Sequence, residues 1–388
     1  MKSILEEYKA GKARLLSMLE DSADSIVRAV QPELKTGRKW KVKEAVEAAK
    51  DSLKIKEIIG HTQTNRQGLG SSKMEWWSKA KGKAKRDMVI QEIRKEEDQG
   101  RLQKAVQQSQ QGQWTAWEGA LQRSLSWNDL WHMAPLRISF ILRSAYDLLP
   151  SNANLVKWGK SEDPSCPLCN GKQTVEHVLS SCKVALTQGR YTWRHNQVLK
   201  ELAEAVEFNT TRSKTGRPEP CTHFLAAGGK NTWPSSTITT RSSRHSLLSE
   251  ADDWECATDL PERNNYPEVI RETGLRPDIV LHSQNAKEIL LVDLTVPYET
   301  RIEDAHAYKT EKYADLAQDL RKAGFRTKVF AIEVGARGFV GSSAYSLMKE
   351  LSISGKSRTR TLKAMSEAAE KASSWIWSRR NKGQLHKA

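Results

Sequence analysis

The sequence has no apolar stretch long enough to cross a lipid bilayer, and its N-terminus lacks the apolar core of a secretory signal peptide. We therefore expect no membrane partner. Cysteine is scarce, with five residues among 388, which argues against a disulfide framework and favours a reducing compartment. No internal repeat is present, so nothing indicates a repeat architecture. The length suffices for two or three domains with at least one hydrophobic core.

Acidic residues are outnumbered by basic ones, 47 against 62, which gives a formal net charge of +15. Such an excess attracts polyanions, whether DNA, RNA or an anionic membrane, and of these we expect nucleic acid as the partner. The run Lys79–Arg86 (KAKGKAKR) has three interpretations: a nuclear-import signal, a patch for backbone phosphates, or a solvated helix face. We favour the solvated face slightly, because basic runs are common.

The chain has thirteen tryptophans, and six of them gather in one part of the sequence. Aromatic side chains among basic residues can stack on nucleic-acid bases, but they are as often ordinary core residues. The sequence favours neither interpretation. The six are Trp76, Trp77, Trp114, Trp117, Trp127 and Trp131.

Three cysteines and one histidine stand at metal-ligand spacing in the run CPLCNGKQTVEHVLSSC. Cys166, Cys169, His177 and Cys182 follow the pattern C-x2-C-x7-H-x4-C, which lets tight turns bring four ligands to the corners of a tetrahedron, as Zn²⁺ prefers. So short a segment should bury almost no core of its own, and we expect a structural zinc ion to supply its folding energy. Small zinc modules of this kind point to nucleic acid.

Hydrophobic patterning predicts an α+β fold with a helical N-terminal half, a zinc knuckle and a small α/β core with a mixed sheet. A helix is expected over 194–206, strands in RPDIVLHS, KEILLVDLTVPY and TKVFAIEVG, and a helix over 301–323. We expect six segments: a basic helical segment (1–87), a second helical region (88–155), the zinc knuckle with its flanking helix (156–208), an irregular linker (209–262), the α/β core (263–345) and a basic C-terminal helix (346–388).

Two aspartates accompany the first two predicted strands of the α/β core. Asp278 heads one strand, and Asp293 lies in EILLVDLTV, where both faces are apolar, so that this strand is buried on both sides. An unpaired carboxylate there would cost several kcal/mol, roughly, unless a metal or a cation compensates. The alternative is that Asp293 lies at a frayed strand end and caps neighbouring backbone.

The helix predicted next carries cations on its apolar face. Lys309 falls in the middle of the apolar stripe, Tyr313 shares the stripe, and Lys312 lies at its margin. One such lysine could simply extend its amine to water. Two carboxylates beside lysines are, however, what a phosphodiesterase needs: Asp278 and Asp293 would hold Mg²⁺, while Lys309 or Lys312 stabilises the developing phosphorane charge.

These motifs resemble those of the PD-(D/E)XK restriction-like nucleases. In the usual pattern a lysine stands two residues after the second acid, where this chain has Thr295, so the lysine would have moved to the helix, to Lys309 or Lys312. The same displacement marks the endonuclease of site-specific retrotransposons without long terminal repeats. The resemblance implies that Asp278 and Asp293 are Mg²⁺ ligands.

The resemblance to that retrotransposon family covers roughly residues 160–340 in order. A CCHC knuckle precedes an Arg-His-Asn motif, matched by Arg194, His195 and Asn196, and a K-x-x-K-Y helix follows the two strands. It implies that the Arg-His-Asn motif and the knuckle bind target DNA or template RNA, and that Tyr313 positions or contacts phosphate. Glu272 and Glu299 flank the strands and could add a ligand, although ordinary surface acids are the commoner case.

Residues 88–155 look like the helical region that follows the thumb of the reverse transcriptase in these polyproteins. The chain lacks the Tyr-x-Asp-Asp metal site of a polymerase, so we expect the C-terminal portion of such an element, without a reverse-transcriptase active site. The family nicks target DNA with Mg²⁺, which implies a nuclear location, with the cytoplasm as the alternative. A catalytically inactive, zinc-dependent nucleic-acid-binding remnant is the second hypothesis, and a host interaction scaffold is the third. The oligomeric state is left open.

Overall fold

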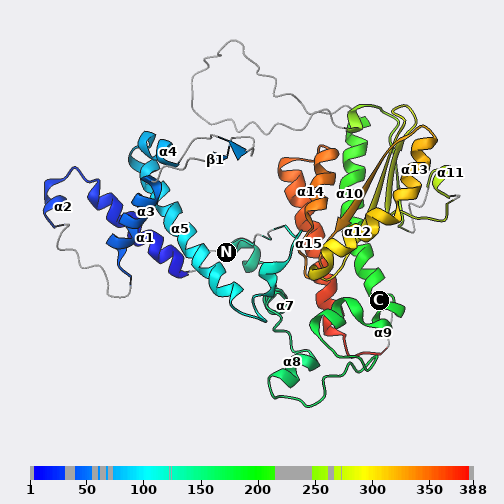
Figure 1. Cartoon of the computed structure of the whole chain (residues 1–388), viewed down its shortest axis with the longest axis horizontal. Coiled ribbons are helices and arrows are strands. Elements are labelled where there is room, and N and C mark those ends of the chain that lie inside the picture. The colour runs from blue at the N-terminus through cyan, green and yellow to red at the C-terminus, as the bar shows by residue number, and fades with distance from the viewer. Residues whose placement is uncertain are drawn as a thin grey trace, which may run out of the picture. The chain divides into compact units, whose positions relative to one another are not determined.

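The computed structural model describes residues 4–30, 40–54, 60–61, 67–68, 73–121, 123, 125–214, 247–260, 266–271 and 273–383. The chain forms two compact units, Met1–Thr115 and Ala116–Ala388 (Figure 1). A helical N-terminal half and a small mixed sheet confirm the predicted α+β class. Across the described part of the chain, no helix combines the length and apolar character that a membrane span requires.

The first unit is built on three helices that bury a shared apolar stripe. In α3 (Val42–Lys54) the buried residues Val42, Val46, Ala49 and Leu53 recur at helical spacing and meet the apolar faces of α1 (Ile4–Glu20) and α5 (Gly82–Val106). α2 (Ser25–Val30) contacts α1, α4 (Lys73–Lys79) contacts α3, and the unit also contains the short antiparallel pair β1 (Gly60–His61) and β2 (Gln67–Gly68).

The second unit is organised around one four-stranded sheet in the order β3-β4-β5-β6. Its first two pairings are antiparallel, whereas β5 and β6 run parallel, so the chain must cross over between them through helices. The strands are β3 (Glu255–Thr258), β4 (Ile279–Ser283), β5 (Glu288–Thr295) and β6 (Arg326–Glu333).

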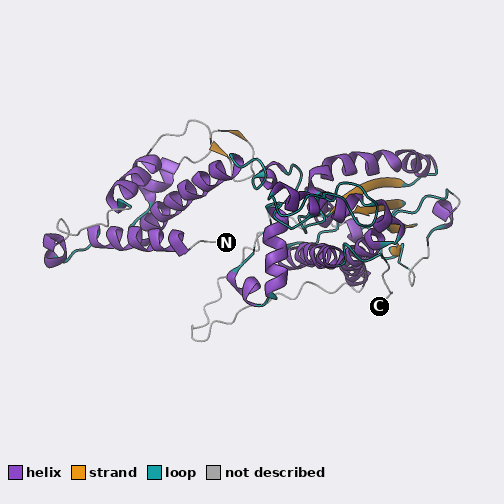
Figure 2. Ribbon diagram, turned by 90° about the horizontal axis from the view of Figure 1, so that it is seen from below, coloured by secondary structure: helices purple, strands orange, loops and turns teal. Residues whose placement is uncertain are grey.

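Helices cover both faces of this sheet (Figure 2). On one face, Val280 and Leu291 lie in one apolar cluster with Tyr313, which follows α12 (Ile302–Lys312), and with Leu316 and Leu320 of α13 (Ala314–Lys322). On the other face, alternate strand residues such as Val292 pack against α10 (Arg190–Lys214), α14 (Ser342–Glu350) and α15 (Gly355–Ser378). β5 is therefore buried on both faces, as predicted from the apolar residues at both its odd and its even positions.

The remaining helices of the described residues are short, and all of them except η2 lie wholly in the second unit. They are η2 (Gln113–Ala116), α6 (Trp127–Trp131), α7 (Pro135–Ala145), α8 (Asn152–Lys157), the π-helix η3 (His177–Ser181), α9 (Lys183–Thr187), η4 (Leu247–Ser249), α11 (Glu268–Arg271) and η5 (Glu299–Arg301).

Several elements differ from the sequence-based prediction. β3 lies inside 209–262, which we expected to be irregular, and residues 215–246 of that segment lie outside the described residues. The helix expected over 301–323 is divided at Tyr313, which ends α12 and precedes α13. The positions 87 and 345, after which we expected segment boundaries, lie inside α5 and α14.

Candidate functional site

The four predicted zinc ligands converge in the second unit. One ligand atom from each of Cys166, Cys169, His177 and Cys182 lies within 4.8 Å of every other, and Sγ of Cys169 is 3.2 Å from Nε2 of His177. Bonds of about 2.3 Å to sulfur and about 2.0 Å to nitrogen place tetrahedral ligands roughly 3.5–3.8 Å apart. The donor set therefore fits a Zn²⁺ ion with no open coordination position, which is the arrangement of a structural site.

The backbone around the cysteines is shaped for this cluster. The amide of Cys166 donates to the carbonyl of Gly171 (2.7 Å), and Asn170, with a φ of 59°, donates back to the carbonyl of Cys166 (2.8 Å). Burial lowers the pKa of His177 below its ordinary value, which keeps the imidazole neutral, as a metal ligand must be. Burial raises the pKa of the Cys182 thiol to about 11, so that metal binding has to displace its proton.

The zinc segment is not a free-standing knuckle, contrary to our expectation that it buries almost no core. Val178 and Leu179 lie in one apolar cluster with Phe140 of α7 and Trp377 of α15. The hydroxyl of Tyr191 accepts from the amide of Cys182 (3.1 Å) and lies 3.0 Å from the carbonyl oxygen of Val178, to which it donates. The zinc segment is thus anchored to the helices of the second unit, and metal binding need not supply all of its folding energy.

Arg194 was expected to contact nucleic acid, but its side chain is only 1% exposed. Its guanidinium donates to the carbonyls of Leu179 (2.7 Å) and Val296 (2.9 Å) and to Oγ of Ser373 (3.0 Å). Burial lowers its pKa to about 10, which still leaves it charged at neutral pH. Arg194 therefore ties the zinc segment to the end of β5 and to α15, and it is not available to a nucleic acid.

The carboxylate of Asp293 lies inside β5 and is 4% exposed. Its Oδ2 pairs with the amine of Lys309 at 2.5 Å, and its Oδ1 accepts from the hydroxyl of Tyr313 at 2.6 Å. Lys312 approaches the same hydroxyl at 3.0 Å. The structure thus brings together four of the five predicted catalytic residues, and it excludes the interpretation of Asp293 as a cap at a frayed strand end.

The remaining predicted residue, Asp278, lies beside Asp293. Its Oδ2 accepts from the amide of Leu294 at 2.6 Å, and the strand register pairs Ile279 with Val292, the residues adjacent to the two acids. Among the described residues, Oδ1 of Asp278 accepts no hydrogen bond. Oδ1 of Asp278 is thus the one oxygen of the two carboxylates without a partner in the described part of the chain. Such a pair suits Mg²⁺, which retains several waters and takes few protein ligands.

His195 joins this group from the opposite side of the sheet. Its Nε2 lies 3.3 Å from Oδ2 of Asp278 and 3.1 Å from the carbonyl of Leu294, while its Nδ1 lies 3.2 Å from Oδ1 of Asn196. Burial would lower the pKa of His195, but the hydrogen bond and the charge of Asp278 outweigh burial and raise it to about 9. His195 therefore contacts Asp278 directly, and Asn196 holds the other ring nitrogen of His195.

Among the described residues, neither the two additional acids nor the tryptophans of the sequence-based prediction form a hydrogen bond or ion pair with Asp278 or Asp293. Glu299 is buried and pairs with Arg337 at 2.6 Å, so it is neither a metal ligand nor a surface acid, and Glu272 lies outside the described residues. The tryptophans are divided: Trp117 is buried over the guanidinium of Arg337, whereas some of the others are exposed. The exposed ones are Trp76, Trp127 and Trp131.

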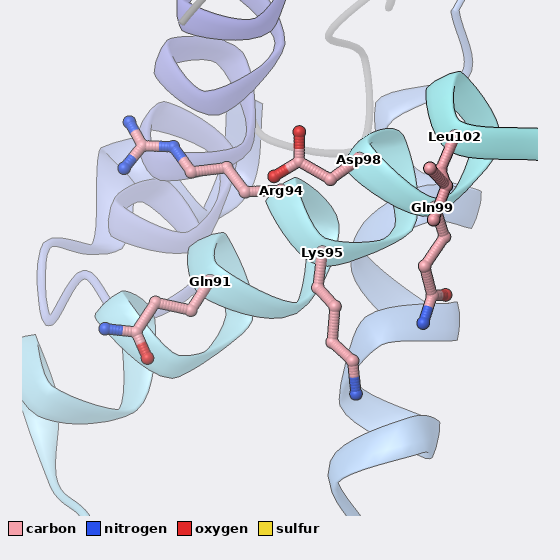
Figure 3. A pocket seen from close by; sticks show the side chains of 6 residues that line it. All are labelled: Gln91, Arg94, Lys95, Asp98, Gln99 and Leu102. Atoms are coloured by element: carbon pink, nitrogen blue, oxygen red, sulfur yellow. The ribbon is translucent and has the colours of Figure 1, made fainter. Parts of the chain in front are cut away.

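A shallow surface hollow lies along α5 of the first unit, and all its lining side chains come from this one helix (Figure 3). Asp98 is its single acidic group. It contains neither the metal-ligand cluster nor the buried carboxylates, so we assign it no chemistry. The hollow is lined by Gln91, Arg94, Lys95, Asp98, Gln99 and Leu102.

Fold and geometry together define an α+β protein with a candidate Cys₃His zinc centre. The model of the family described as zinc-binding in reverse transcriptase matches residues 109–188, a segment that contains all four ligands. The matched residues span less than a quarter of the chain, and none of the curated proteins matches it. The segment is therefore similar to a retroelement zinc-binding domain, which suggests binding of nucleic acid.

Sequence reasoning missed the groups that hold the centre in place. Arg190 donates to the carbonyls of Arg379 (2.9 Å) and Lys382 (2.5 Å) beyond the end of α15, and Tyr191 holds the π-helix. Both residues belong to the run RYTWRHN, which begins eight residues after the ligand Cys182, and this nearness was a signal of a supporting function. Their partners, however, lie up to 192 residues away in the sequence.

Proposed function

We propose that this chain is a retroelement-derived nucleic-acid-binding protein whose second unit is a Mg²⁺-dependent, restriction-like DNA endonuclease. The observation that carries the proposal is the buried carboxylate of Asp293, which meets Lys309 and Tyr313 beside Asp278. Two neighbouring carboxylates that meet an amine and a phenol are the groups that a metal-assisted phosphodiesterase uses.

Each side chain has a defined task in hydrolysis of a phosphodiester. Asp278 and Asp293 would hold Mg²⁺, which supplies a Lewis acid and an activated water when bound. The amine of Lys309, already at the carboxylate, is placed to stabilise the negative charge that develops on the phosphoryl oxygens. Tyr313 orients Asp293, and His195 orients Asp278.

The zinc segment, the excess of basic residues and the family match support nucleic acid as the partner. DNA is the proposed target, element RNA is a second proposed partner, and the nucleus is the proposed location. A catalytically inactive nucleic-acid-binding remnant is the second candidate. The Cys₃His centre favours this candidate, because a zinc ion with four protein ligands has no open position for a substrate and can serve binding but not cleavage.

A plasmid-nicking assay separates the two candidates. The zinc-loaded chain should convert supercoiled plasmid to the open circle when Mg²⁺ is present. Asp293→Asn, which keeps the shape but removes the charge, should reduce the rate by at least about 10²-fold. Asp304→Asn, an exposed acid on α12, is the matched control and should nick like the wild type. Equal nicking by Asp293→Asn, or no nicking by the wild type despite tight DNA binding, would leave only the binding function.

A further inference from the structure

A further carboxylate, that of Glu333, is buried at the end of β6, on the face of the sheet that carries Asp293. Parallel register pairs Asp293 with Ala331 and Thr295 with Glu333, so Glu333 stands two residues further along the neighbouring strand. Side chains two residues apart on a strand share a face, and such diagonal neighbours lie about 8 Å apart. Glu333 is 2% exposed and does not belong to the predicted catalytic set.

Glu333 orients a histidine. Its Oε2 accepts from Oγ of Ser343 at 2.6 Å, and its Oε1 lies 3.0 Å from Nδ1 of His306. Burial raises the pKa of Glu333, although Ser343 and His306 oppose this effect. A carboxylate bonded to one ring nitrogen fixes the tautomer and the orientation of an imidazole, as in many catalytic and metal sites.

The other nitrogen of His306 is left for a ligand. The side chain is half exposed, and among the residues that the structure describes Nε2 has no hydrogen-bond partner. His306 precedes Lys309 by three residues on α12, so the two side chains are neighbours on one helix face. Lys309 reaches Asp293, and His306 is held one turn nearer the N-terminus of the helix.

We propose that His306 contacts a DNA phosphate next to the one that is cleaved, with Glu333 and Ser343 as positioning residues. This inference rests on the proposed nuclease function, because it takes the carboxylates of Asp278 and Asp293 as the centre of the bound strand. Glu333 holds Nδ1, and the outward Nε2 is placed to donate to a phosphate oxygen.

Two isosteric variants separate this contact from a structural function. Asparagine reproduces the donor at Nδ1, so His306→Asn keeps the bond to Glu333 but loses the outer nitrogen. Glutamine reproduces Nε2, so His306→Gln keeps a donor for phosphate. Binding of a short DNA duplex by the zinc-loaded chain is measured with Ca²⁺ in place of Mg²⁺, over a range of salt concentrations. His132→Asn is the control, because His132 is also exposed, with its Nδ1 next to a protein oxygen.

We expect His306→Asn to weaken DNA binding about fivefold, as for the loss of one hydrogen bond to a phosphate. His306→Gln should retain more affinity, and His132→Asn should be unchanged. Wild-type affinity of His306→Asn across the salt range would overturn the assignment.

Nicking by the wild type in Mg²⁺ tests the nuclease proposal separately. If the wild type nicks and His306→Asn binds normally, only the assignment of His306 is refuted. If His306→Asn weakens binding but nothing nicks, the phosphate contact stands without the cleavage. A wild type that does not bind DNA refutes both.

Discussion

Arg194 carries a positive charge into the interior of the second unit, where three protein oxygens accept from its guanidinium. Taking such a group out of water costs several kcal/mol, about as much as its hydrogen bonds return. Arg194 therefore adds little net stability by itself, and its function is to link the zinc segment to the end of β5 and to α15.

The Arg194→Met variant keeps the bulk but leaves the carbonyls of Leu179 and Val296 without this donor. We expect a loss of about 2–4 kcal/mol of unfolding free energy in urea. Arg143→Met, at an exposed arginine of α7, should change stability by less than about 0.5 kcal/mol. Unchanged stability combined with a large loss of DNA affinity would contradict the structural function and return Arg194 to the nucleic-acid surface.

His195 makes stability depend on pH in a defined direction. Its pKa is raised to about 9 in the folded chain, against about 6.5 when unfolded, so the folded state binds the proton more tightly. The contribution is complete below about pH 6.5 and is lost as the pH rises through about 9. Without added divalent cation, the wild type should lose about 2–3 kcal/mol of unfolding free energy over this range, beyond any loss in His195→Gln. Equal pH dependence of the two proteins would refute the His195–Asp278 pair.

At the scale of elements, the zinc segment combines a metal cluster with an apolar anchor. Its π-helix η3 buries Val178 and Leu179 against Trp377 of α15, and Tyr191 and Arg194 of α10 hold its backbone. Losing the metal should therefore loosen the turn around Cys166 and Cys169 without unfolding the sheet.

The Cys169→Ser variant tests this ligand set. It should bind clearly less than one zinc per chain and lose nucleic-acid affinity in parallel, because the loop that zinc closes would be disordered. Cys256→Ser, at a half-buried cysteine of β3, is the control and should retain zinc. Zinc content by atomic emission, measured with DNA affinity, is the readout; full zinc content in Cys169→Ser would contradict the assignment.

The sequence was sufficient for elements whose pattern is local. β5 was predictable because eight residues alternate onto two buried faces, and the position of Lys309 followed from the period of the helix. β3 was not predictable, because its four residues ECAT carry little pattern and acquire their strand conformation by pairing with β4. The zinc ligands followed from spacing alone, since a metal imposes its own geometry.

The burial of charged residues could not be predicted from the sequence, because it depends on partners that lie far away along the chain. The partners of Arg194 lie up to 179 residues away, and Glu299 meets Arg337 across 38 residues. Whether a charged side chain turns outward or forms an internal pair depends on such distant neighbours. His306 was missed for the same reason, since its partner Glu333 stands on a strand 27 residues later.

At the scale of the whole molecule, the chemistry is concentrated in one of two units. The candidate zinc centre and the carboxylates of Asp278 and Asp293 belong to the second unit, whereas the first contributes a helical bundle rich in charge. Arg194 connects the zinc segment with the loop after β5, so the metal centre and the carboxylates share one rigid support.

The central claim is that Asp278 and Asp293 share a divalent cation, and Mn²⁺ binding to the zinc-loaded chain tests it most directly. Electron paramagnetic resonance of free Mn²⁺ should reveal about one site per chain in the wild type, as expected for two carboxylates that hold one octahedral ion. The site should be lost in the double variant Asp278→Asn, Asp293→Asn. Identical Mn²⁺ titrations for the wild type and the double variant would contradict the account.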